Sequence, residues 1–367
     1  MTNLLIVQPR LTTYRLPFFE GLIAELAKDD IACRVASPPA GGVAAARGDS
    51  DHNPPWHTFT QGGTLRIRGR TISYLGSGPA QRSADAVIVA MLGSSYDTYR
   101  AILTGKFRGI PVGLWGHIKS YTSESHPLDA LVERWQLMNA SRVFAYTPGG
   151  AAEAIRLGVR PHAVTTVMNS VDTATLCTAA SAVDPAVVDA FVERHSLDRC
   201  RTAAYFGGLD QAKRIDFLAE SLAELAQLDP RFKLIVGGRG ASIELLRPAI
   251  DRGQVIHMGY VGSSEKALVS KVASTLAMPG RIGLIAVEAL ALGLPVITTK
   301  WKYHSAEIEY LQEGVSMFSS DDDPRSYAHK LLASTERFAE RPAPARAHPT
   351  MDQMIGNFAA GVRAMLV

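Results

Sequence analysis

Glycines and basic residues gather at one point in the second half of this sequence, where they could bind an anion. The apolar run 203–206 leads into Gly207 and Gly208, and Lys213 and Arg214 follow before a helix-like segment. Glycine lets a phosphate approach the backbone closely, and both the cations and a helix N-terminus attract it. The spacing predicts a phosphate site, although a Gly-Gly turn beside an exposed basic pair explains the same residues.

A second glycine-containing loop reads PGRIGLIAVE over 279–288. Its pattern predicts that Gly280 and Arg281 follow a strand and that a helix opens at Gly283, Leu284 and Ile285. The first N–H groups of a helix have no partner within it, so this turn is a second candidate anion site.

Glu288 lies one turn into the same predicted helix, where the neighbouring residues are apolar. A carboxylate without a partner is costly to bury, so we expect Glu288 to face a ligand. A carboxylate can accept two hydrogen bonds from the diol of a ribose. Pairing with a neighbouring arginine is the structural alternative.

The positions of these loops depend on an alternation of strand-like and helix-like segments through the chain. Strands are predicted at 4–7, 31–36, 86–91, 111–115, 142–146, 165–168, 203–206, 232–236, 255–258, 275–278 and 294–298, and helices at 16–27, 95–104, 128–139, 149–157, 184–195, 215–226, 284–292 and 350–367. The pattern predicts an α/β fold of two doubly wound, Rossmann-like domains that face a cleft, with ligands at the carboxyl ends of the strands.

The 367 residues suffice for two domains at roughly 100 to 200 residues each. We predict an N-terminal domain over 1–170, a linker and helix over 171–199, a C-terminal domain over 200–345 and a final helix within 346–367, which can cross back to the first domain. The first predicted strand is followed by QPRLTTYRLPFF, without a GxGxxG fingerprint, which disfavours a nicotinamide-dependent enzyme.

Composition narrows the class of protein. The three cysteines, Cys33, Cys177 and Cys200, have no spacing typical of a disulfide framework or a zinc site, so we expect a reducing, cytoplasmic location and no metal. No apolar run reaches the roughly 18 residues of a membrane span. Residues 1–170 hold 17 Lys or Arg against 12 Asp or Glu, net +5, which leaves 21 against 23, net −2, for the remainder.

Taken together, the motifs resemble those of retaining GT-B glycosyltransferases of family 4, in order and in spacing. The stretches that carry the resemblance are GGLDQAKRIDFL, KLIVGGRG, VIHMGYV and PGRIGLIAVEALALGLPVITT, with YRLPFF, LWGH and MNSVD in the first half. The resemblance covers nearly the whole chain. It implies transfer of a hexose from a nucleoside diphosphate sugar, carrying UDP or GDP, with retention of configuration and without a cofactor.

The resemblance also implies roles for particular residues. Lys213 matches the basic residue on the donor diphosphate, and Glu288 matches the second glutamate of an E-x7-E motif that holds the ribose. His117 matches a histidine beside the donor sugar, and Tyr260 falls where such enzymes hold the base. Two positions depart from the family pattern. Gly280 replaces the first glutamate, which contacts the donor sugar, and Gly208 replaces an arginine, so Arg214 and Arg281 are candidates to supply the missing charge.

The first domain is expected to bind the acceptor, through Tyr14 and Arg15 after the first strand. An arginine there suits a phosphate or an acidic sugar, although Arg15 could equally pair within its own helix start. Enzymes of this kind often build exopolysaccharide or lipopolysaccharide on lipid-linked acceptors, and the basic first half, including Arg66, Arg68 and Arg70, suits an anionic membrane at the inner face of the cell. Two alternatives remain: a sugar-nucleotide epimerase or hydrolase of the same fold, and a nucleotide-binding subunit that has lost catalysis.

Overall fold

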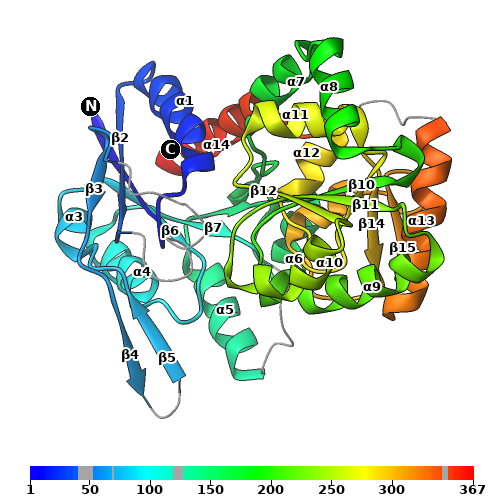
Figure 1. Cartoon of the computed structure of the whole chain (residues 1–367). Coiled ribbons are helices and arrows are strands. Elements are labelled where there is room, and N and C mark those ends of the chain that lie inside the picture. The colour runs from blue at the N-terminus through cyan, green and yellow to red at the C-terminus, as the bar shows by residue number, and fades with distance from the viewer. Residues whose placement is uncertain (40–52, 68–69, 119–126, 341–345) are drawn as a thin grey trace. The chain divides into compact units, whose positions relative to one another are not determined.

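The computed structural model describes residues 1–39, 53–67, 70–118, 127–340 and 346–367 (Figure 1). The chain divides into two compact units. The first comprises Met1–Ala45, Asp49–Val171 and Pro349–Val367, and the second comprises Ala46–Gly48 and Asp172–His348. Both are α/β and Rossmann-like, so the predicted fold class is confirmed. Arg68, which belongs to the predicted basic cluster, and residues 341–345 at the predicted domain end lie outside the described residues.

The first unit is built on a parallel sheet. In spatial order its seven strands are β3 (His57–Phe59), β2 (Ile31–Ser37), β1 (Thr2–Val7), β6 (Ala86–Ala90), β7 (Val112–Gly116), β8 (Arg142–Ala145) and β9 (Val164–Thr166). All six pairings are parallel. Such a sheet is buried on both faces, which is why its strands read as continuous apolar runs rather than as alternating patterns.

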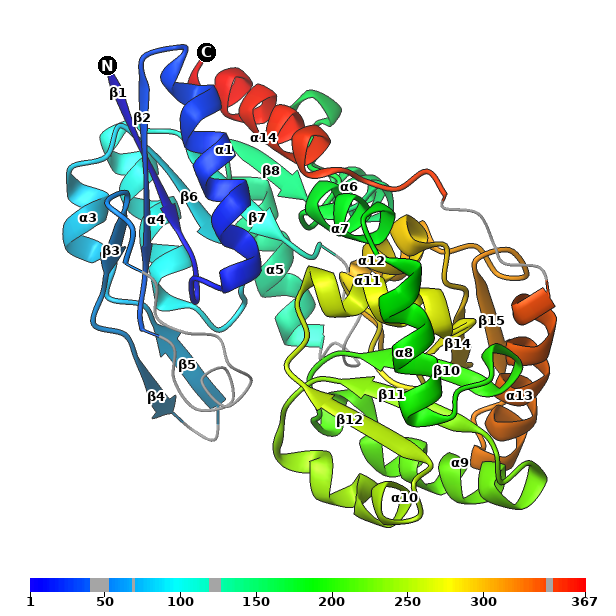
Figure 2. The same cartoon turned by 45° about the horizontal axis from the view of Figure 1, so that its top comes forward.

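Alternate residues of β1 enter two separate cores in the first unit. Leu4 and Ile6 pack with α1 (Leu16–Ala27) and α14 (Met351–Leu366), whereas Leu5 and Val7 face the core under α4 (Tyr96–Arg108), α5 (Pro127–Asn139) and α6 (Pro148–Arg156). Figure 2 shows α1 and α14 side by side although they come from opposite ends of the chain. The last helix is therefore part of the first unit.

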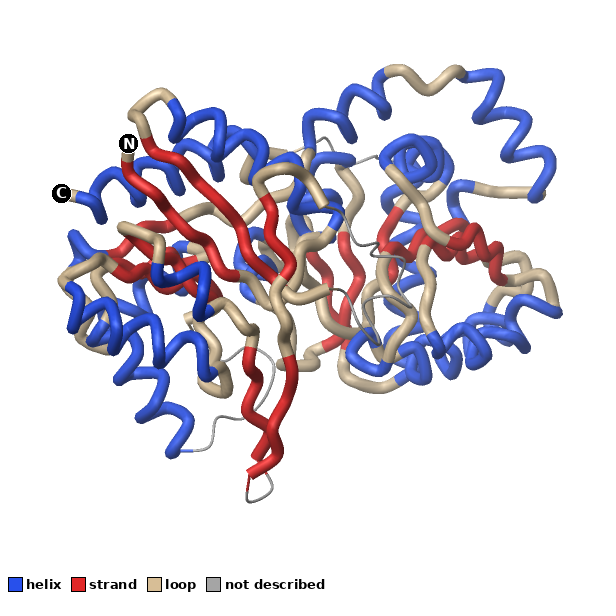
Figure 3. Tube along the Cα trace, turned by 90° about the vertical axis from the view of Figure 1, so that its left-hand side faces the viewer, coloured by secondary structure: helices blue, strands red, loops and turns tan. Residues whose placement is uncertain are grey.

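A two-stranded hairpin of the first unit extends beyond the edge of the seven-stranded sheet. Its strands are β4 (Gly63–Ile67) and β5 (Arg70–Tyr74), which pair antiparallel, and the short helix α3 (Gly78–Arg82) follows (Figures 1 and 3). The sequence pattern did not predict these elements. Two members of the predicted basic cluster, Arg66 and Arg70, belong to this hairpin.

The second unit has a six-stranded parallel sheet. Its strands, in spatial order, are β12 (Val255–Gly259), β11 (Lys233–Gly237), β10 (Thr202–Phe206), β13 (Thr275–Ala277), β14 (Val296–Thr299) and β15 (Met317–Ser320). The helices of this unit are α7 (Thr173–Ser181), α8 (Pro185–His195), α9 (Ile215–Leu228), α10 (Arg247–Asp251), α11 (Ser263–Val272), α12 (Ile285–Leu292) and α13 (Pro324–Glu340). One apolar core of buried residues joins the sheet to its helices.

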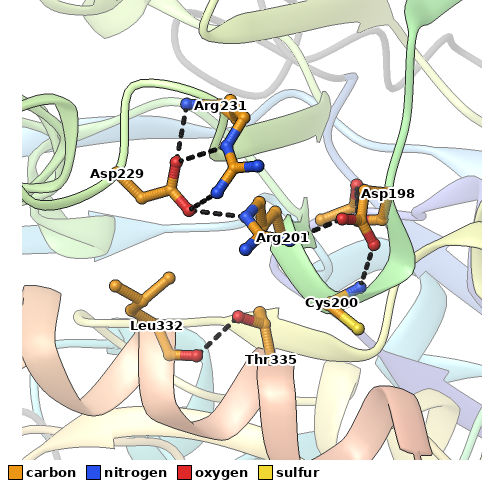
Figure 4. Close-up of polar contacts among 8 residues, drawn as sticks. Asp198, Cys200, Arg201, Asp229, Arg231, Leu332 and Thr335 are labelled. Atoms are coloured by element: carbon orange, nitrogen blue, oxygen red, sulfur yellow. Dashed lines mark hydrogen bonds and ion pairs between the residues drawn. The ribbon is translucent and has the colours of Figure 1, made fainter.

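A network of charged groups holds the amino ends of β10 and β11 together (Figure 4). The guanidinium of Arg201 donates to Asp198 at 2.6 Å and to Asp229 at 2.5 Å, and Asp229 also accepts from Arg231. These contacts lower the pKa of Asp229 against the opposing effect of its burial, because its charged form accepts several hydrogen bonds. The network lies at the amino end of the sheet. It therefore stabilises the sheet there and does not occupy the carboxyl ends of the strands, where ligands bind.

The differences from the predicted elements have local causes. The helix predicted at 95–104 continues to Arg108, where Gly109 ends it in the left-handed conformation. The strand predicted at 165–168 ends at Thr166, and Met168 has a positive φ of 57°. Helices α7 and α11 were not predicted, because small and polar residues weaken their apolar periodicity. Helix α13 was not predicted either, although its apolar residues recur at helical spacing.

Candidate functional site

The candidate site is built on the reversal of strand order in the second unit. From β10 the chain proceeds to β11 and β12 on one side, and then to β13, β14 and β15 on the other. In an open parallel sheet, ligands bind outside the carboxyl ends of the strands at such a reversal. Here these ends are Gly207 and Gly208 after β10 and the loop 278–284 after β13.

The loops after β10 and β11 touch backbone to backbone. The Gly207 amide donates to the Gly237 carbonyl at 3.0 Å, and a Cβ atom at residue 238 would lie 1.8 Å from the Gly207 oxygen. Gly240 has a φ of 156°, and a Cβ atom at residue 240 would likewise be too close to the backbone of Leu209. Gly238 and Gly240 are thus needed for close packing of the two loops, a requirement that the sequence pattern alone did not separate from phosphate binding.

Lys213 connects the loops on both sides of the strand reversal. It ends a 3-10 turn over Gln211–Lys213, and its ammonium donates to the carbonyl of Arg281 after β13. The same ammonium nitrogen lies 3.8 Å from the position that a Cβ atom would take at Gly207. The predicted diphosphate cation therefore lies over the strand reversal, half-buried, with its charge held between the ends of β10 and β13.

Gly280, the first departure from the family pattern, is enclosed by backbone. A Cβ atom at residue 280 would lie 2.3 Å from the carbonyl carbon of Lys213 and 2.7 Å from its Cα. The neighbouring amide of Arg281 donates to the Ala212 carbonyl at 2.9 Å, which keeps the two loops together. A glutamate does not fit at residue 280 in this arrangement. The close contact between these loops is therefore incompatible with the carboxylate that the resemblance implies at this position.

The two arginines proposed to supply charge differ in their surroundings. Arg214 has a φ of 54° and forms an ion pair with Asp322, donates to Thr299 at 3.2 Å and stacks on Phe217 at 4.2 Å. These contacts give Arg214 a role in holding the sheet end together. By contrast, Nε of Arg281 is buried without a hydrogen-bond partner among the described residues. Arg281 thus keeps a buried donor that no contact within the described chain satisfies.

Helix α12 begins beside these cations. Its N-cap is Leu284, whose side chain cannot accept a hydrogen bond from the first turn. The helix starts at Ile285, as the predicted range of 284–292 implied to within one residue. Gly283, Leu284 and Ile285 therefore bring the positive end of a helix to the carboxyl end of β13.

Glu288 of α12 is paired with a lysine of the neighbouring helix α11. Nζ of Lys266 lies 2.7 and 2.9 Å from the two carboxylate oxygens of Glu288, and both side chains are largely buried. Glu288 therefore forms an ion pair, as the structural alternative expected, but its partner is a lysine and not an arginine. Lys266 was not identified from the sequence, since nothing in its local pattern distinguishes it from a surface lysine.

A buried histidine supports the loop after β13. Nδ1 of His304 accepts a hydrogen bond from the Ile282 amide at 3.2 Å. Burial, together with the charges of Lys213, Arg281 and Arg214, lowers the pKa of His304 to about 4, although a hydrogen bond with the Trp301 backbone opposes this shift. The imidazole is therefore neutral near pH 7 and acts as an acceptor.

Three predicted residues of the first unit form a second cluster. Arg15 is buried, donates to Asn169 at 2.6 Å, and lies 5.3 Å from the ring centres of Tyr14 and Trp115. Its guanidinium is also 6.0 Å from the Tyr146 ring. The structure thus favours a structural role for Arg15, since aromatic rings and an amide surround its charge. Its hydrogen-bond partner Asn169 is far away in the chain and does not belong to the start of its own helix.

His117 and Tyr14 border this cluster at the carboxyl ends of the strands. His117 follows β7, is exposed, and its ring lies 4.5 Å from that of Tyr146. Tyr14 is 44% exposed, which leaves its ring accessible to a ligand while Arg15 beneath it is not. The predicted residues of the first unit therefore come together around Tyr146, which the sequence did not single out.

Tyr260 lies directly after β12 and is 57% exposed. Its place at a strand end agrees with the position predicted for a base-binding residue, two strands from β10. A shallow depression near β15 lies elsewhere, lined by Lys300, Ser319, Ser320, Asp321, Ser326, His329 and Lys330. None of the predicted residues lines it, and its Lys300 is paired with Asp321 at 2.7 Å.

Two further features bear on ligands and membranes. Within the described ranges, no three His, Cys, Asp or Glu side chains are grouped so that they could hold a metal ion. No single helix in the described part of the chain is long and apolar enough to cross a membrane; α7 and α8, bent by 86°, meet that test only as a pair.

Comparison with known proteins agrees with this geometry. Residues 200–336 match the family model of glycosyl transferases group 1. The second unit is thus similar to this family of transferases. The matched segment contains β10 to β15 and every predicted donor-site residue of the second unit. No curated protein sequence is significantly similar to the chain.

Solved structures with the same fold include both transferases and epimerases. HepE of Anabaena in complex with UDP is 14% identical with a TM-score of 0.63, covering 99% of this chain and all of that one. A glycosyltransferase from Rickettsia africae is 12% identical with a TM-score of 0.64, covering 99% and 98%. UDP-GlcNAc 2-epimerase from Neisseria meningitidis bound to UDP-GlcNAc is 14% identical with a TM-score of 0.63, covering 99% and all of that chain. These likenesses show the GT-B fold over the full length of the chain.

Proposed function

We propose that this protein transfers a hexose from a nucleoside diphosphate sugar to a saccharide or lipid-linked acceptor, with retention of anomeric configuration. The observation that carries the proposal is the position of Lys213, whose ammonium lies over the strand reversal between Gly207 and the carbonyl of Arg281. A donor diphosphate held there would meet Lys213, the half-buried side chain of Arg281 and the first turn of α12.

We propose UDP as the nucleotide of the donor. The fold is shared with HepE in complex with UDP-glucose and with an epimerase bound to UDP-GlcNAc. Tyr260 would lie near the base and Glu288 near the ribose, in which case Glu288 exchanges part of its pairing with Lys266 for hydroxyl groups of the sugar. GDP remains the alternative nucleotide, as predicted from the sequence.

The chemistry proposed is a displacement at the anomeric carbon. The bond from that carbon to the β-phosphate oxygen breaks, and its electron pair stays on the phosphate. The acceptor hydroxyl oxygen bonds to the carbon on the same face and passes its proton to the leaving phosphate. Lys213 and Arg281 stabilise the charge that develops on the phosphate, and one such preorganised donor is typically worth about 3 kcal/mol. His117 is proposed to orient the sugar.

A screen of nucleotides and nucleotide sugars by thermal shift tests donor binding. A ligand at about a hundred times its Kd stabilises the folded state by about 2.7 kcal/mol, so UDP and its sugars should raise Tm clearly. The protein is then incubated with a labelled UDP-sugar and a panel of acceptors, and the product that carries the label is identified. Transfer to an acceptor with the donor's anomeric configuration supports the proposal, whereas an inverted product contradicts retention.

Epimerisation or hydrolysis of the donor is the second candidate. It is favoured by the full-length likeness to UDP-GlcNAc 2-epimerases and by Gly280, which removes the carboxylate expected on the donor sugar. The same labelled experiment separates the candidates. Without an acceptor, an epimerase yields a new UDP-sugar and a hydrolase yields free sugar, whereas a transferase leaves the donor largely intact.

The proposed reaction needs no metal ion or other cofactor. Lys213, Arg281 and the helix N-terminus are assigned the charge stabilisation that a divalent ion supplies in other transferases. Activity in EDTA should equal activity in magnesium-containing buffer. Loss of turnover in EDTA that a divalent ion restores would contradict this part of the proposal.

A further inference from the structure

Two neighbouring helices of the first unit expose large apolar side chains. On α4, Phe107 is 93% and Leu103 is 56% exposed; on α5, Leu131 is 63%, Met138 is 50% and Trp135 is 38% exposed. Single exposed apolar residues are ordinary, but a contiguous group of this kind marks an interaction site.

The two helices bring these side chains into one stripe. The rings of Tyr99 on α4 and Trp135 on α5 stack with centroids 5.9 Å apart, and Lys106 donates to the side chain of Asn139. Leu103 lies one turn beyond Tyr99, and Phe107 one turn beyond Leu103. On α5, Leu131, Trp135 and Met138 are spaced four and three residues apart, so they share one face.

Basic residues border the stripe on both sides. On α4 the border is formed by Arg100, which lies against Gly78, and by the exposed Arg108, which donates to the Gln81 carbonyl at 3.2 Å. On α5 the exposed Arg134 occupies the opposite border. The only acidic residue of α4, Asp97, is buried and accepts from the Leu75 and Ser77 amides.

The acidic residues of α5 lie away from the stripe. Glu133 is two residues from Trp135 in the sequence and its side chain faces Gly93. Asp129 is six residues from Trp135, a spacing that turns it away from the same face. Burial raises the pKa of Glu133, and the nearby charge of Asp129 adds to this effect.

We propose that this α4–α5 face docks on the surface of an anionic lipid bilayer. Aromatic and aliphatic side chains flanked by arginine and lysine are the composition that lies at the boundary of headgroups and acyl chains. A second copy of the chain would place the arginine borders of two molecules against each other, which disfavours self-association through this face. The inference concerns an interaction surface and is independent of the reaction proposed above.

Sedimentation of the full chain with vesicles tests the proposal. We expect binding to vesicles of equal parts phosphatidylcholine and phosphatidylglycerol, weaker binding to pure phosphatidylcholine, and release as salt shortens the Debye length below about 8 Å. Phe107→Ser combined with Leu131→Ser should lower partitioning at least tenfold. Val187→Ser, at a half-exposed valine of α8 in the second unit, is the matched control and should bind as the parent does.

Separate variants test the contribution of the arginines to binding and the insertion of Trp135 into the bilayer. Arg108→Gln with Arg134→Gln should weaken binding to anionic vesicles only, whereas Lys271→Gln, at an exposed lysine of α11, should not. Trp135 fluorescence should shift to the blue on binding, with Trp135→Phe removing the shift. UDP titration and Tm establish that each variant is folded.

Three results would overturn the proposal. One is equal binding to anionic and neutral vesicles, or none to either. Another is unchanged partitioning of the Phe107→Ser, Leu131→Ser variant. The third is a dimer that this variant dissociates, which would assign the face to a second copy of the chain. Because UDP binding is measured on the same samples, failure of membrane docking is distinguishable from failure of the proposed donor site.

Discussion

The loops after β1 and β10 occupy the same position in the two sheets yet are built differently. Each follows the strand at which strand order reverses. After β1 the space is filled by side chains, with Arg15 enclosed by Tyr14, Trp115 and Tyr146. After β10 the chain packs as bare backbone, and Gly207 and Gly238 are close enough to exclude any Cβ at residue 238.

This comparison shows how one topology yields two kinds of strand end. An arginine whose charge rests on aromatic rings and an amide stabilises its own unit, whereas a thin glycine loop places the half-buried ammonium of Lys213 over the strand reversal. A cation is therefore not by itself a sign of a ligand site. Its surroundings decide whether the charge holds the fold or remains for a substrate.

The largest effect is expected from adding a side chain to the thin loops. Gly280→Ala places a methyl group within 2.3 Å of the Lys213 backbone, so Tm should fall and UDP affinity should drop at least a hundredfold, about 2.7 kcal/mol. Gly280→Glu should fail in the same way rather than restore the family's glutamate. Calorimetry measures the affinity.

Gly356→Ala in α14 is the matched control for this glycine. No atom lies within 4 Å of a Cβ at residue 356, and a helix gains up to about 1 kcal/mol from alanine. If Gly280→Ala binds UDP as the parent does while Gly356→Ala behaves as expected, the close contact of the loops is not needed for the site.

Lys213 should affect turnover far more than folding. Lys213→Ala is expected to lower kcat by at least a hundredfold, about 2.7 kcal/mol, because its charge is needed most when the diphosphate leaves. Tm should change little, and Lys213→Arg should restore part of the rate. Steady-state kinetics on a UDP-sugar provide the measurement, with Lys271→Ala as control. A rate within tenfold of the parent would remove Lys213 from catalysis.

Arg15 should show the opposite behaviour. Arg15→Met loses a charged hydrogen bond to Asn169 and contacts with the surrounding rings, so the first unit should be destabilised by about 2 kcal/mol. Affinity for UDP should not change, since the donor site is assigned to the second unit. Unaltered stability together with a raised KM for the acceptor would return Arg15 to the acceptor site.

Glu288 tests whether an ion pair and a ligand site can share one carboxylate. Glu288→Gln should weaken UDP binding about tenfold, about 1.4 kcal/mol, if the ribose contact holds. Lys266→Met removes the pairing at 2.7 Å and leaves the carboxylate in place, so it should reduce stability more than affinity. Equal UDP affinity in Glu288→Gln and in the parent would leave Glu288 with the structural role alone.

The titration of His304 is expected to change the stability of the protein with pH, and not its affinity for UDP. Its pKa is lowered from 6.5 to about 4 in the folded chain, so the unfolded chain binds the proton more tightly. Stability is therefore retained above pH 6.5 and declines as pH falls from 6.5 towards 4, on the order of 1 kcal/mol per pH unit. His304→Asn, which keeps an acceptor for the Ile282 amide, should flatten this slope in denaturant titrations.

Short-range patterns were enough for the central elements of both units. The ranges predicted at 16–27, 86–91, 215–226 and 284–292 fall on α1, β6, α9 and α12 to within two residues at each end. These segments are continuous apolar runs or strongly amphipathic helices, which leave few alternatives. Helix α13 escaped prediction although it is among the longest and its apolar residues recur at helical spacing.

The sequence by itself determined where the chemistry gathers, because glycines, cations and a helix start at set distances from a strand are local properties. Only the tertiary structure decided what each charge does. Burial among aromatic rings turns Arg15 into a structural residue, a lysine 22 positions away pairs with Glu288, and the Lys213 backbone makes glycine obligatory at residue 280. Such roles depend on contacts between segments far apart in the chain, and no local pattern encodes them.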